Sequence, residues 1–356
     1  MNVKNVRIKD IAQLAGVSVG TVDRVLHNRG RVSEDALKKV MTVLDQIDYK
    51  PNLIARTLGA NKSYRIAALI PNPQQDPYWA STKAGISQAE AEWLRYGVTI
   101  EQYFFNLYDK NSFKSVAEAV THAKPDGILV APIFYHETLP FFDIIKKSEI
   151  PFVLFNTNIP EASALSFIGQ NLFESGRVGA ELMYLAQQGK PGVLAVLHIN
   201  EDLDNSVHLL EKEKGFREYF NAKNHSGYEV RTLNLNNPSE PIFEKQLSSF
   251  LSDPNLSGIF VSTSKATYLI ASFLEKHNRR GLTLIGYDML DQNIQYMKKG
   301  IIDFLINQNP KRQAFLGINH LVCYLVLKKE SPQKDLLPLE IITRENLDSY
   351  LNSGIH

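Results

Sequence analysis

The sequence predicts an α/β protein with two parts, a small N-terminal module of three helices and a larger body of two doubly wound, parallel-sheet lobes. Residues 8–47 contain three short apolar stripes at helical spacing. From residue 64 onward, continuous apolar runs alternate with amphipathic helices, as in parallel sheets covered on both faces. About 290 residues of such units exceed what one sheet usually holds, so we expect two lobes.

The composition agrees with a multidomain protein that carries a basic module. A chain of 356 residues is too long for one typical core, and its 44% hydrophobic and 22% charged residues describe an ordinary globular protein. The net charge of +1 conceals an asymmetry, because residues 1–62 hold 11 Lys and Arg against 6 Asp and Glu. A basic module on a mildly acidic body is typical of a protein that binds a phosphate backbone.

Cysteine content and apolar runs bear on the compartment. The single cysteine, Cys323, excludes an internal disulfide and a Cys-rich metal site, and its apolar neighbours favour a buried thiol. The N-terminal MNVKNVR lacks the apolar run of a signal peptide, and no apolar stretch has the length of a membrane span. We therefore expect a cytoplasmic protein with no membrane partner, no cofactor and no metal.

The stretch IKDIAQLAGVSVGTVDRVLHN, residues 8–28, predicts two helices joined by a tight turn. Gly16 ends the first helix and permits a left-handed turn, and the Ser18 hydroxyl is placed to accept from open N–H groups of the second. Two apolar stripes form the expected core: Ile8, Ile11, Ala12 and Ala15 in the first helix, and Val22, Val25 and Leu26 in the second.

Small side chains and one arginine remain on the outer face of the second helix: Val19, Gly20, Thr21, Asp23 and Arg24. A helix with such an exposed N-terminal half can enter the major groove of DNA, where Val19 and Gly20 would face bases and Thr21 and Arg24 would anchor the groove and phosphates. The alternative is a plain αα-hairpin, since two short helices around a glycine occur in many folds.

A loop and a third helix complete the module. Arg29 and Arg31 in the loop either reach phosphates or are solvated loop charges. Ser33 begins the helix, with Glu34 and Asp35 in the first turn, where the helix dipole favours acidic side chains. The predicted buried stripe is Leu37, Val40, Met41, Leu44 and Ile47.

Residues 51–63 form the boundary between module and body. Pro51 cannot continue a helix that precedes it. The following NLIARTLGANKS has the length of one short helix that is marginal alone. The alternative is a domain linker in which Leu53 and Leu58 only pack on neighbouring residues.

Three segments in this order, AGVSVGTVDRVL, VSEDALKKV and YKPNLIARTL, resemble the DNA-binding headpiece of the lac-repressor (LacI/GalR) family. The resemblance implies a helix-turn-helix headpiece at residues 1–50 and a hinge helix at residues 51–63 that folds on DNA as a pair. There Leu58 would enter the minor groove, where an apolar wedge unstacks a base step and bends the duplex. The implied DNA-binding residues are Ser18, Val19, Gly20, Thr21, Arg24, Arg29, Arg31, Asn52, Ala55 and Leu58.

One headpiece position departs from the family pattern. Asp23 stands where the family usually has the serine of TVSRV. A carboxylate there is repelled by phosphate unless it pairs with a neighbour such as Arg24 or contacts a cytosine amino group. Since Val19 and Gly20 offer little hydrogen bonding, the operator sequence cannot be read from these residues.

The body contains eight predicted strands and several long helical segments. The strands are Ile66–Ile70, Val98–Tyr103, Gly127–Ala131, Phe152–Phe155, Val193–His198, Val230–Leu235, Gly258–Ser262 and Leu282–Gly286. The helical segments include Trp79–Arg95, Glu174–Gln188, Ser206–Asn221 and Ala266–His277.

The resemblance implies a periplasmic sugar-binding-protein fold for residues 64–356. In that fold the chain crosses between lobes three times, and we place the crossings near Gly169, Gln308 and Ser331. The N lobe then comprises residues 64–169 and 309–330, and the C lobe residues 170–308 and 331–356. A ligand is expected in the cleft at the carboxyl ends of the strands, where open α/β sheets generally bind.

Two adjacent aromatic residues follow the first predicted strand. The loop NPQQDPYWAS supplies Asp76, Tyr78 and Trp79. A carboxylate beside two rings suits a sugar, whose C–H faces stack on rings while its hydroxyls form hydrogen bonds. Similar sugar-binding proteins carry NPFF here, which implies that Tyr78 and Trp79 stack on the effector. The alternative is that one of the two rings packs into the core of the lobe.

Four further polar residues match effector-contacting positions of the family: Asn156, Lys212, Asp288 and Gln308. Asn156 stands where such binders use an aspartate, and Lys212 where they often have an arginine, so the charge is kept but the planar fork is lost. Asp288 ends a strand and has helix capping as its alternative role. Ala131, Thr157 and Thr263 replace residues that ribose-type binders carry, which makes ribose itself doubtful.

No catalytic constellation is recognisable. The sequence lacks HExxH, GxSxG and the phosphate-binding GxxxxGK[ST], and the acidic cluster of Glu201, Asp202 and Asp204 is interpreted as a solvated loop because a calcium loop would need a glycine and a terminal glutamate. The favoured hypothesis is a homodimeric transcription regulator that binds double-stranded operator DNA and a small-molecule effector. The alternatives are a sugar-binding protein for transport and a doubly wound enzyme.

Overall fold

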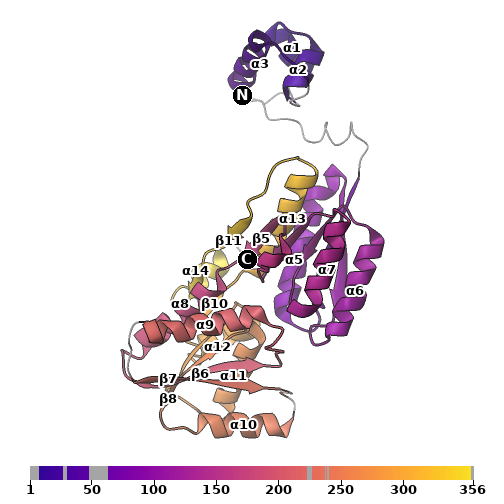
Figure 1. The fold of residues 1–356 in the computed structure, drawn as a ribbon. Helices are drawn as coiled ribbons and strands as arrows, with labels where there is room; N and C mark the ends of the chain where they lie inside the picture. Colours follow the sequence, from indigo (N-terminus) through magenta and orange to yellow (C-terminus); the bar gives the residue numbers. More distant parts are fainter. Residues whose placement is uncertain are drawn as a thin grey trace. The chain divides into compact units, whose positions relative to one another are not determined.

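The computed structural model describes residues 8–26, 30–47, 63–222, 227–236, 238 and 240–353. The chain divides into two compact units at Asn61 and Lys62 (Figure 1). No helix within these ranges combines the length and the apolar composition that a membrane span needs.

The first unit contains the three predicted helices, α1 (Ile8–Ala15), α2 (Val19–Leu26) and α3 (Glu34–Gln46). Gly16 has a φ of +64°, which confirms the left-handed turn after α1. The Ser18 hydroxyl accepts from the Thr21 amide at 3.1 Å, and the Ser33 hydroxyl accepts from the Ala36 amide at 3.4 Å. Both predicted helix starts are therefore capped by their serines.

The buried stripe of α3 differs from the predicted one. Val40 and Val43 are its buried residues, and Leu44 and Ile47 pack beside them. Leu37 and Met41 were predicted to be buried but are 43% and 48% exposed. The apolar residues of α3 span more than one helical face, and only the packing of α1 and α2 decides which face is covered.

The N lobe is a wholly parallel six-stranded sheet with the order β11-β5-β4-β3-β1-β2. Its strands are β1 (Tyr64–Pro71), β2 (Val98–Phe105), β3 (Gly127–Val130), β4 (Phe152–Phe155), β5 (Ser166–Gly169) and β11 (Lys334–Leu336). Helices α5 (Pro77–Trp93) and α13 (Pro310–Leu325) cover one face, and α6 (Lys110–Ala123) and α7 (Tyr135–Lys147) cover the other (Figure 1). Coverage of both faces explains why β3, β4 and β5 are buried throughout.

The C lobe is a second six-stranded sheet with the order β12-β10-β9-β8-β6-β7, in which only β12 is antiparallel to its neighbour. Its strands are β6 (Gly192–Ile199), β7 (Tyr228–Leu235), β8 (Leu256–Val261), β9 (Thr283–Tyr287), β10 (Phe304–Asn307) and β12 (Glu340–Ile342). The helices on its two faces are α8 (Leu172–Ala186) and α9 (Val207–Ala222), then α10 (Pro241–Leu251), α11 (Ser264–Lys276) and α12 (Asp291–Lys298). Short elements complete the body: η1 (Leu94–Tyr96), η2 (Pro160–Ala162) and α14 (Leu347–Asn352).

All eight predicted strands are present, and four more were not in the predicted set. These four, β5, β10, β11 and β12, are only three or four residues long. Segments of that length show little periodicity, and these four become strands where a neighbouring strand offers an edge to pair with.

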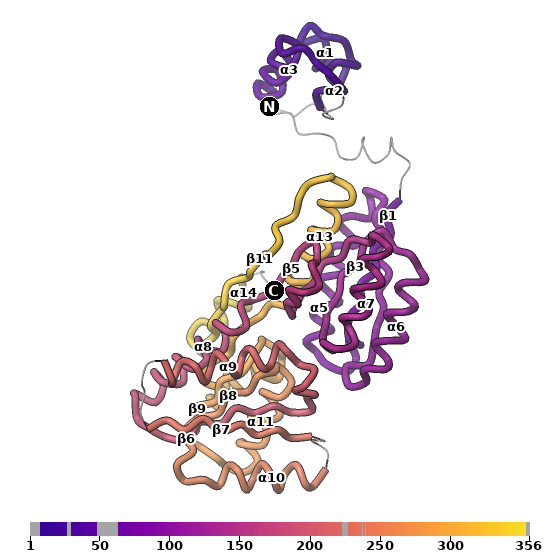
Figure 2. Tube along the Cα trace, in the orientation of Figure 1, coloured from indigo at the N-terminus to yellow at the C-terminus, as the bar shows by residue number. Residues whose placement is uncertain are grey.

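Three segments join the lobes, after β5, after β10 and after β11 (Figure 2). The first two lie at the predicted crossings near Gly169 and Gln308. The third was predicted near Ser331, and this was wrong, because β11 still pairs with β5 and the Leu337 amide donates to the Gly169 carbonyl at 2.7 Å. The chain therefore crosses between β11 and β12, and residues 331–336 belong to the N lobe.

One side chain links all three crossings. The Gln170 Nε2 donates to the Asn307 carbonyl at 2.9 Å and to the Pro338 carbonyl at 2.7 Å. Gln170 is 3% exposed. Its amide therefore holds the three connecting segments at a common point, around which the lobes are joined.

Helices α8 and α9 touch through their backbones. A Cβ atom added at Gly176 would lie 1.9 Å from the Lys212 carbonyl oxygen, and one added at Gly215 would lie 1.9 Å from the Phe173 carbonyl oxygen. Glycine is needed at both positions because any side chain would push the helices apart. This contact fixes the backbone of α9 at Lys212.

We expect Gly176→Ala to lower the free energy of unfolding of the body by about 1–3 kcal/mol, because the added methyl group overpacks the contact between α8 and α9. Urea denaturation followed by circular dichroism measures this change. Glu181→Ala, at an exposed position of the same helix, is the matched control and should change it by less than about 0.5 kcal/mol. Equal free energies of unfolding for the two variants would show that α8 and α9 can move apart at Gly176 without a loss of stability.

Candidate functional site

The outer face of α2 is open to solvent. Val19 is 45% exposed, and Gly20 and Arg24 are exposed. Thr21 is half-buried, and its hydroxyl lies 2.9 Å from that of Ser18. A row of small side chains followed by an arginine is thus presented on one helix, as a helix that enters the major groove requires.

The remaining residues predicted to bind DNA divide into two groups. Arg31 is exposed in the loop that precedes α3. Arg29, Asn52, Ala55 and Leu58 lie outside the residues that the structure describes. The same holds for nearly all of the predicted hinge, residues 51–63.

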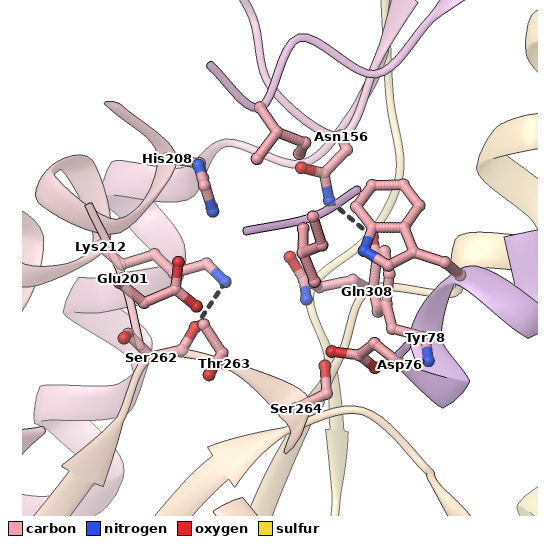
Figure 3. Close-up of a pocket in the computed structure, with 13 residues that line it drawn as sticks. Asp76, Tyr78, Asn156, Glu201, His208, Lys212, Ser262, Thr263, Ser264 and Gln308 are labelled. Carbon is pink, nitrogen blue, oxygen red and sulfur yellow. Dashed lines mark hydrogen bonds between the residues drawn. The ribbon is translucent and has the colours of Figure 1, made fainter. Parts of the chain in front are cut away.

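A cavity lies between the two lobes of the body, at the carboxyl ends of the strands in both sheets. The space between its walls, including the part open to solvent, is about 480 Å³. Its lining consists of Asp76, Tyr78, Trp79, Leu107, Ile133, Asn156, Glu201, His208, Lys212, Ser262, Thr263, Ser264 and Gln308. Figure 3 shows Glu201, His208 and Lys212 on one side and Asp76, Tyr78 and Asn156 on the other.

The aromatic pair of the N lobe has two roles. The Tyr78 and Trp79 rings meet edge to face with centroids 4.9 Å apart, and Trp79 meets Phe155 in the same way at 6.2 Å. Both rings are about 95% buried in the core of the lobe, yet both line the cavity. Core packing therefore holds the rings in place and leaves part of each toward a ligand.

Asp76 begins the helix that carries these rings. Its Oδ1 accepts from the Tyr78 amide at 2.9 Å, so it caps α5 and also lines the cavity. Burial, with a smaller contribution from Asp288, raises the pKa of Asp76 to about 6, although the Tyr78 amide and Lys265 oppose the shift. The carboxylate is therefore held where its charge is poorly solvated.

Asn156 and Gln308 are joined through a buried glutamine. The Asn156 Nδ2 donates to the Tyr78 hydroxyl at 2.6 Å, and the Asn156 amide donates to Gln313 Oε1 at 3.0 Å. Gln313 Nε2 in turn donates to the Gln308 carbonyl at 2.8 Å. Asn156 has a φ of +67°, a conformation that asparagine tolerates better than most residues. Two effector positions from different segments are thus fixed by one network.

Asp288 lies behind the cavity wall. It is 1% exposed, and its carboxylate accepts from the Ser264 hydroxyl and from the amide and side chain of Gln308, the latter two at 2.7 Å each. Helix capping was its alternative role, but α12 begins only at Asp291, with Leu290 as its N-cap residue. Asp288 therefore positions two residues that line the cavity.

Lys212 is a buried cation in the cavity. Its Nζ donates to the Ser262 carbonyl at 3.0 Å and lies 3.6 Å from the centroid of the Tyr287 ring. Burial lowers its pKa to about 8, while Asp288 and Glu201 partly restore it. The ammonium is stabilised by a carbonyl and an aromatic face, which leaves it at the border between charged and neutral at physiological pH.

Sequence reasoning missed Glu201, His208, Ser262 and Ser264. Asp202 and Asp204 are exposed, as a solvated loop requires, but Glu201 was assigned to the same loop and instead lines the cavity. Burial and the charge of Asp76 raise the pKa of Glu201 to about 8. The position of Glu201, two residues after the carboxyl end of the buried strand β6, is the feature of the sequence that could have indicated its role.

His208 presents a buried nitrogen to the cavity. Its Nδ1 has no hydrogen-bond partner among the described residues. Burial, followed by the charge of Lys212, lowers its pKa to about 3, so the imidazole is neutral. It thus offers one neutral nitrogen to a ligand.

In the described ranges no group of three His, Cys, Asp or Glu residues could hold a metal ion.

The two lobes also touch at the rim of the cleft. Asn205, in the loop before α9, accepts from the first two amides of α7 in the N lobe: its carbonyl oxygen from Tyr135 at 3.2 Å and its Oδ1 from His136 at 2.9 Å. Its Nδ2 donates to Glu137 Oε2 at 2.7 Å. Phe134, the N-cap residue of α7, provides no side-chain cap, so a residue of the C lobe caps this helix.

Comparison with known proteins covers nearly the whole chain. Residues 7–52 match the model of bacterial regulatory proteins of the lacI family, and residues 66–329 match the periplasmic binding protein domain. The sucrose operon repressor of Streptococcus mutans is 26% identical over 355 residues, covering 96% of this chain and 99% of that protein. Catabolite control protein A of the same species is 25% identical over 334 residues, covering 88% and 96%.

Solved structures agree with this match. A protein assigned as a LacI transcriptional regulator from Bacteroides fragilis has a TM-score of 0.76 at 28% identity, and the alignment covers 81% of this chain and all of that one. The two family models match the two units of the chain in order. The lacI model covers the N-terminal unit, and the periplasmic-binding-protein model covers most of the two-lobed body. The chain therefore belongs to the lacI family of bacterial regulatory proteins and is a DNA-binding transcriptional regulator with a periplasmic-binding-protein-like effector domain.

Proposed function

We propose that the effector of this regulator is a sugar or sugar derivative that binds in the cavity between the lobes and changes operator affinity. The observation that carries the proposal is the composition of the cavity wall, in which Tyr78 of the N lobe lies opposite polar side chains of the C lobe (Figure 3) and Trp79 also lines the cavity. A sugar presents C–H faces to rings and hydroxyls to polar groups, so this wall suits it.

Each effector residue has a role in this proposal. Tyr78 and Trp79 stack on the sugar ring, and Asp76, Asn156, Lys212 and Gln308 form hydrogen bonds with its substituents. Asp288 acts through Ser264 and Gln308, whose side chains it holds. A ligand that touches both lobes favours the closed cleft, since only closure brings the two sets of groups together.

The DNA-bound form is proposed to be a cytoplasmic homodimer on an operator with two-fold symmetry. Each α2 lies in a major groove, with Val19 and Gly20 at the base edges and Thr21, Arg24 and Arg31 at the groove and phosphates. For the hinge we propose that Leu58 enters the minor groove and that Asn52 and Ala55 contact DNA. Arg29, in the loop before the third helix, is also proposed to contact DNA. By linkage, effector and operator alter each other's affinity by the same factor, typically about 1–3 kcal/mol.

The effector site is tested by a thermal-shift screen of the full chain against neutral sugars, amino sugars, sugar phosphates, polyols and nucleosides. A saturating ligand raises the melting temperature because it binds only the folded protein. We expect a hit among the sugars or their derivatives. Asp288→Ala should abolish that shift and leave operator binding by the free protein unchanged. A shift that survives in Asp288→Ala, or a blank screen, would contradict the cavity assignment.

Closure of the cleft is tested by Asn205→Ala. The substitution removes two hydrogen bonds between the lobes, each contributing about 0.5–1.5 kcal/mol, so we expect effector affinity to fall by about fivefold or more. Small-angle X-ray scattering of the free variant should show a larger radius of gyration. Asp204→Ala, at the exposed neighbouring position, is the control. An unchanged radius and affinity in Asn205→Ala would exclude a role of this contact in closure.

The DNA interface is tested with an operator selected by the wild-type protein from a random library. Arg24→Ala should weaken binding and, if Arg24 contacts a phosphate, reduce the slope of log affinity against log salt by about 1. Fluorescence anisotropy titrations at several salt concentrations measure both quantities. Arg280→Ala, an exposed arginine of the body, should change neither. Identical curves for wild type and Arg24→Ala would remove α2 from the interface.

A further inference from the structure

The cavity contains carboxylates that the chain itself does not neutralise. Asp288 has both oxygens in hydrogen bonds with Ser264 and Gln308. By contrast, the described residues donate a single hydrogen bond to the Asp76 carboxylate, from the Tyr78 amide to Oδ1, and none to that of Glu201. Both side chains line the cavity. Three oxygens of two carboxylates are thus left for a ligand.

The nearby cations are already engaged elsewhere. Lys212 donates to the Ser262 carbonyl and lies over the Tyr287 ring. Lys265 donates to the Gln75 carbonyl at 3.0 Å and to the Tyr108 hydroxyl at 3.2 Å. Within the described part of the chain, neither lysine forms an ion pair with Asp76 or Glu201.

Asp76 and Glu201 line the same cavity from different lobes, so a closing movement of the cleft would bring the two carboxylates closer together. Asp76 follows β1 of the N lobe, and Glu201 follows β6 of the C lobe. Figure 3 shows them on opposite sides of the same cavity. Two like charges in a space with little water repel each other, so the closed state needs either a proton or a ligand cation between them.

We propose that the effector is an amino sugar whose protonated amine binds between Glu201 and Asp76 while its ring packs against Tyr78 and Trp79. This inference rests on the proposed function and names the chemical class of the effector. An ammonium group donates three hydrogen bonds, which matches the three free carboxylate oxygens. The unpartnered Nδ1 of His208 is left for a hydroxyl of the same sugar.

The same arrangement disfavours anionic sugars. A phosphate or carboxylate on the ligand would enter a space that already holds Asp76 and Glu201, with Asp288 behind the wall. Lys212 is the one cation among the residues that line this cavity, and its charge is shared with Ser262 and Tyr287. Neutral sugars meet no repulsion but leave the Asp76 carboxylate without a counter-charge.

Binding of the amine is coupled to release of a proton. In the free protein the pKa of Glu201 is raised to about 8 by burial and by Asp76, so Glu201 is protonated at neutral pH. An ammonium ligand needs the ionised carboxylate, so affinity should rise by up to about tenfold per pH unit as long as the pH lies below both the pKa of Glu201 and the pKa of the ligand's amine. The other titratable or charged groups around Glu201 and Asp76 are Tyr78, His208, Lys212, Lys265, Tyr268 and Asp288.

The test is a calorimetric comparison of matched sugars with the full chain. For glucose, galactose and mannose, the set contains the parent sugar, the 2-, 3- and 6-amino sugars, the N-acetyl-amino sugar and the 6-phosphate. We expect at least one amino sugar to bind about ten- to a hundredfold more tightly than its parent, its N-acetyl derivative and its phosphate, since a charged hydrogen bond is lost in each comparison. Tightest binding by a neutral or anionic member overturns the inference and leaves the proposed sugar site intact. A set without any binding contradicts both.

Two variants and the pH dependence locate the amine. Glu201→Gln should lower affinity for the amino sugar about tenfold or more and remove the rise of affinity with pH. Asp204→Asn, at the exposed position three residues away, should retain both. Equal affinity and an equal pH profile for Glu201→Gln and wild type would show that the amine does not bind at Glu201.

The free protein provides a readout that needs no ligand. Glu201 is protonated in the folded state up to a pKa of about 8 but ionises near 4.5 in the unfolded state, so it increasingly destabilises the protein as the pH rises from 4.5 to 8. The melting temperature of Glu201→Gln relative to wild type should therefore increase over this range and stay constant above it. A difference that does not change with pH would show that Glu201 is not buried against Asp76.

Discussion

Two parallel sheets that direct the carboxyl ends of their strands at one cleft are the constraint on which this molecule depends. Segments that follow several strands of both sheets open into the same space, so polar residues from distant parts of the chain meet there. Asp76 comes after β1, Asn156 after β4, Glu201 after β6 and Ser264 after β8. The fold thereby gathers charged groups in a place with little water, where each changes the ionisation of the others.

Hydrogen bonds at the connection between the lobes and across the opening of the cleft hold this space in position. At the crossings, the Gln170 amide binds the carbonyls of Asn307 and Pro338 and so joins the three segments between the lobes. At the rim, Asn205 of the C lobe caps α7 of the N lobe. Lys265 of the C lobe also donates to the Gln75 carbonyl and to the Tyr108 hydroxyl of the N lobe. The relative position of the lobes therefore depends on a small set of hydrogen bonds at the connection and across the opening. A ligand that adds contacts across the cleft can therefore shift it.

Stability and ligand binding oppose each other in the cavity. Burial raises the pKa of Asp76 and Glu201 and lowers that of Lys212, which means that each charged form is disfavoured in the folded protein. The backbone contact at Gly176 nevertheless fixes the segment of α9 that carries Lys212. Packing thus holds ionisable groups where their charged forms are poorly solvated. A ligand of complementary charge stabilises those charged forms when it binds.

The sequence by itself determined what depends on local chemistry. Gly16, Ser18 and Ser33 predicted the helix ends of the headpiece, and apolar runs predicted eight strands, because caps and periodicity are properties of neighbouring residues. The segments that follow predicted strands, together with the family resemblance, predicted six of the residues that line the cavity. Tertiary structure decided the rest. It exposes Leu37, and it moves the third crossing between the lobes to a point after β11. It also places Asp288 behind the cavity wall and Glu201 in the cavity. These depend on which surfaces meet, and a surface formed by residues far apart in the chain leaves no pattern in either segment.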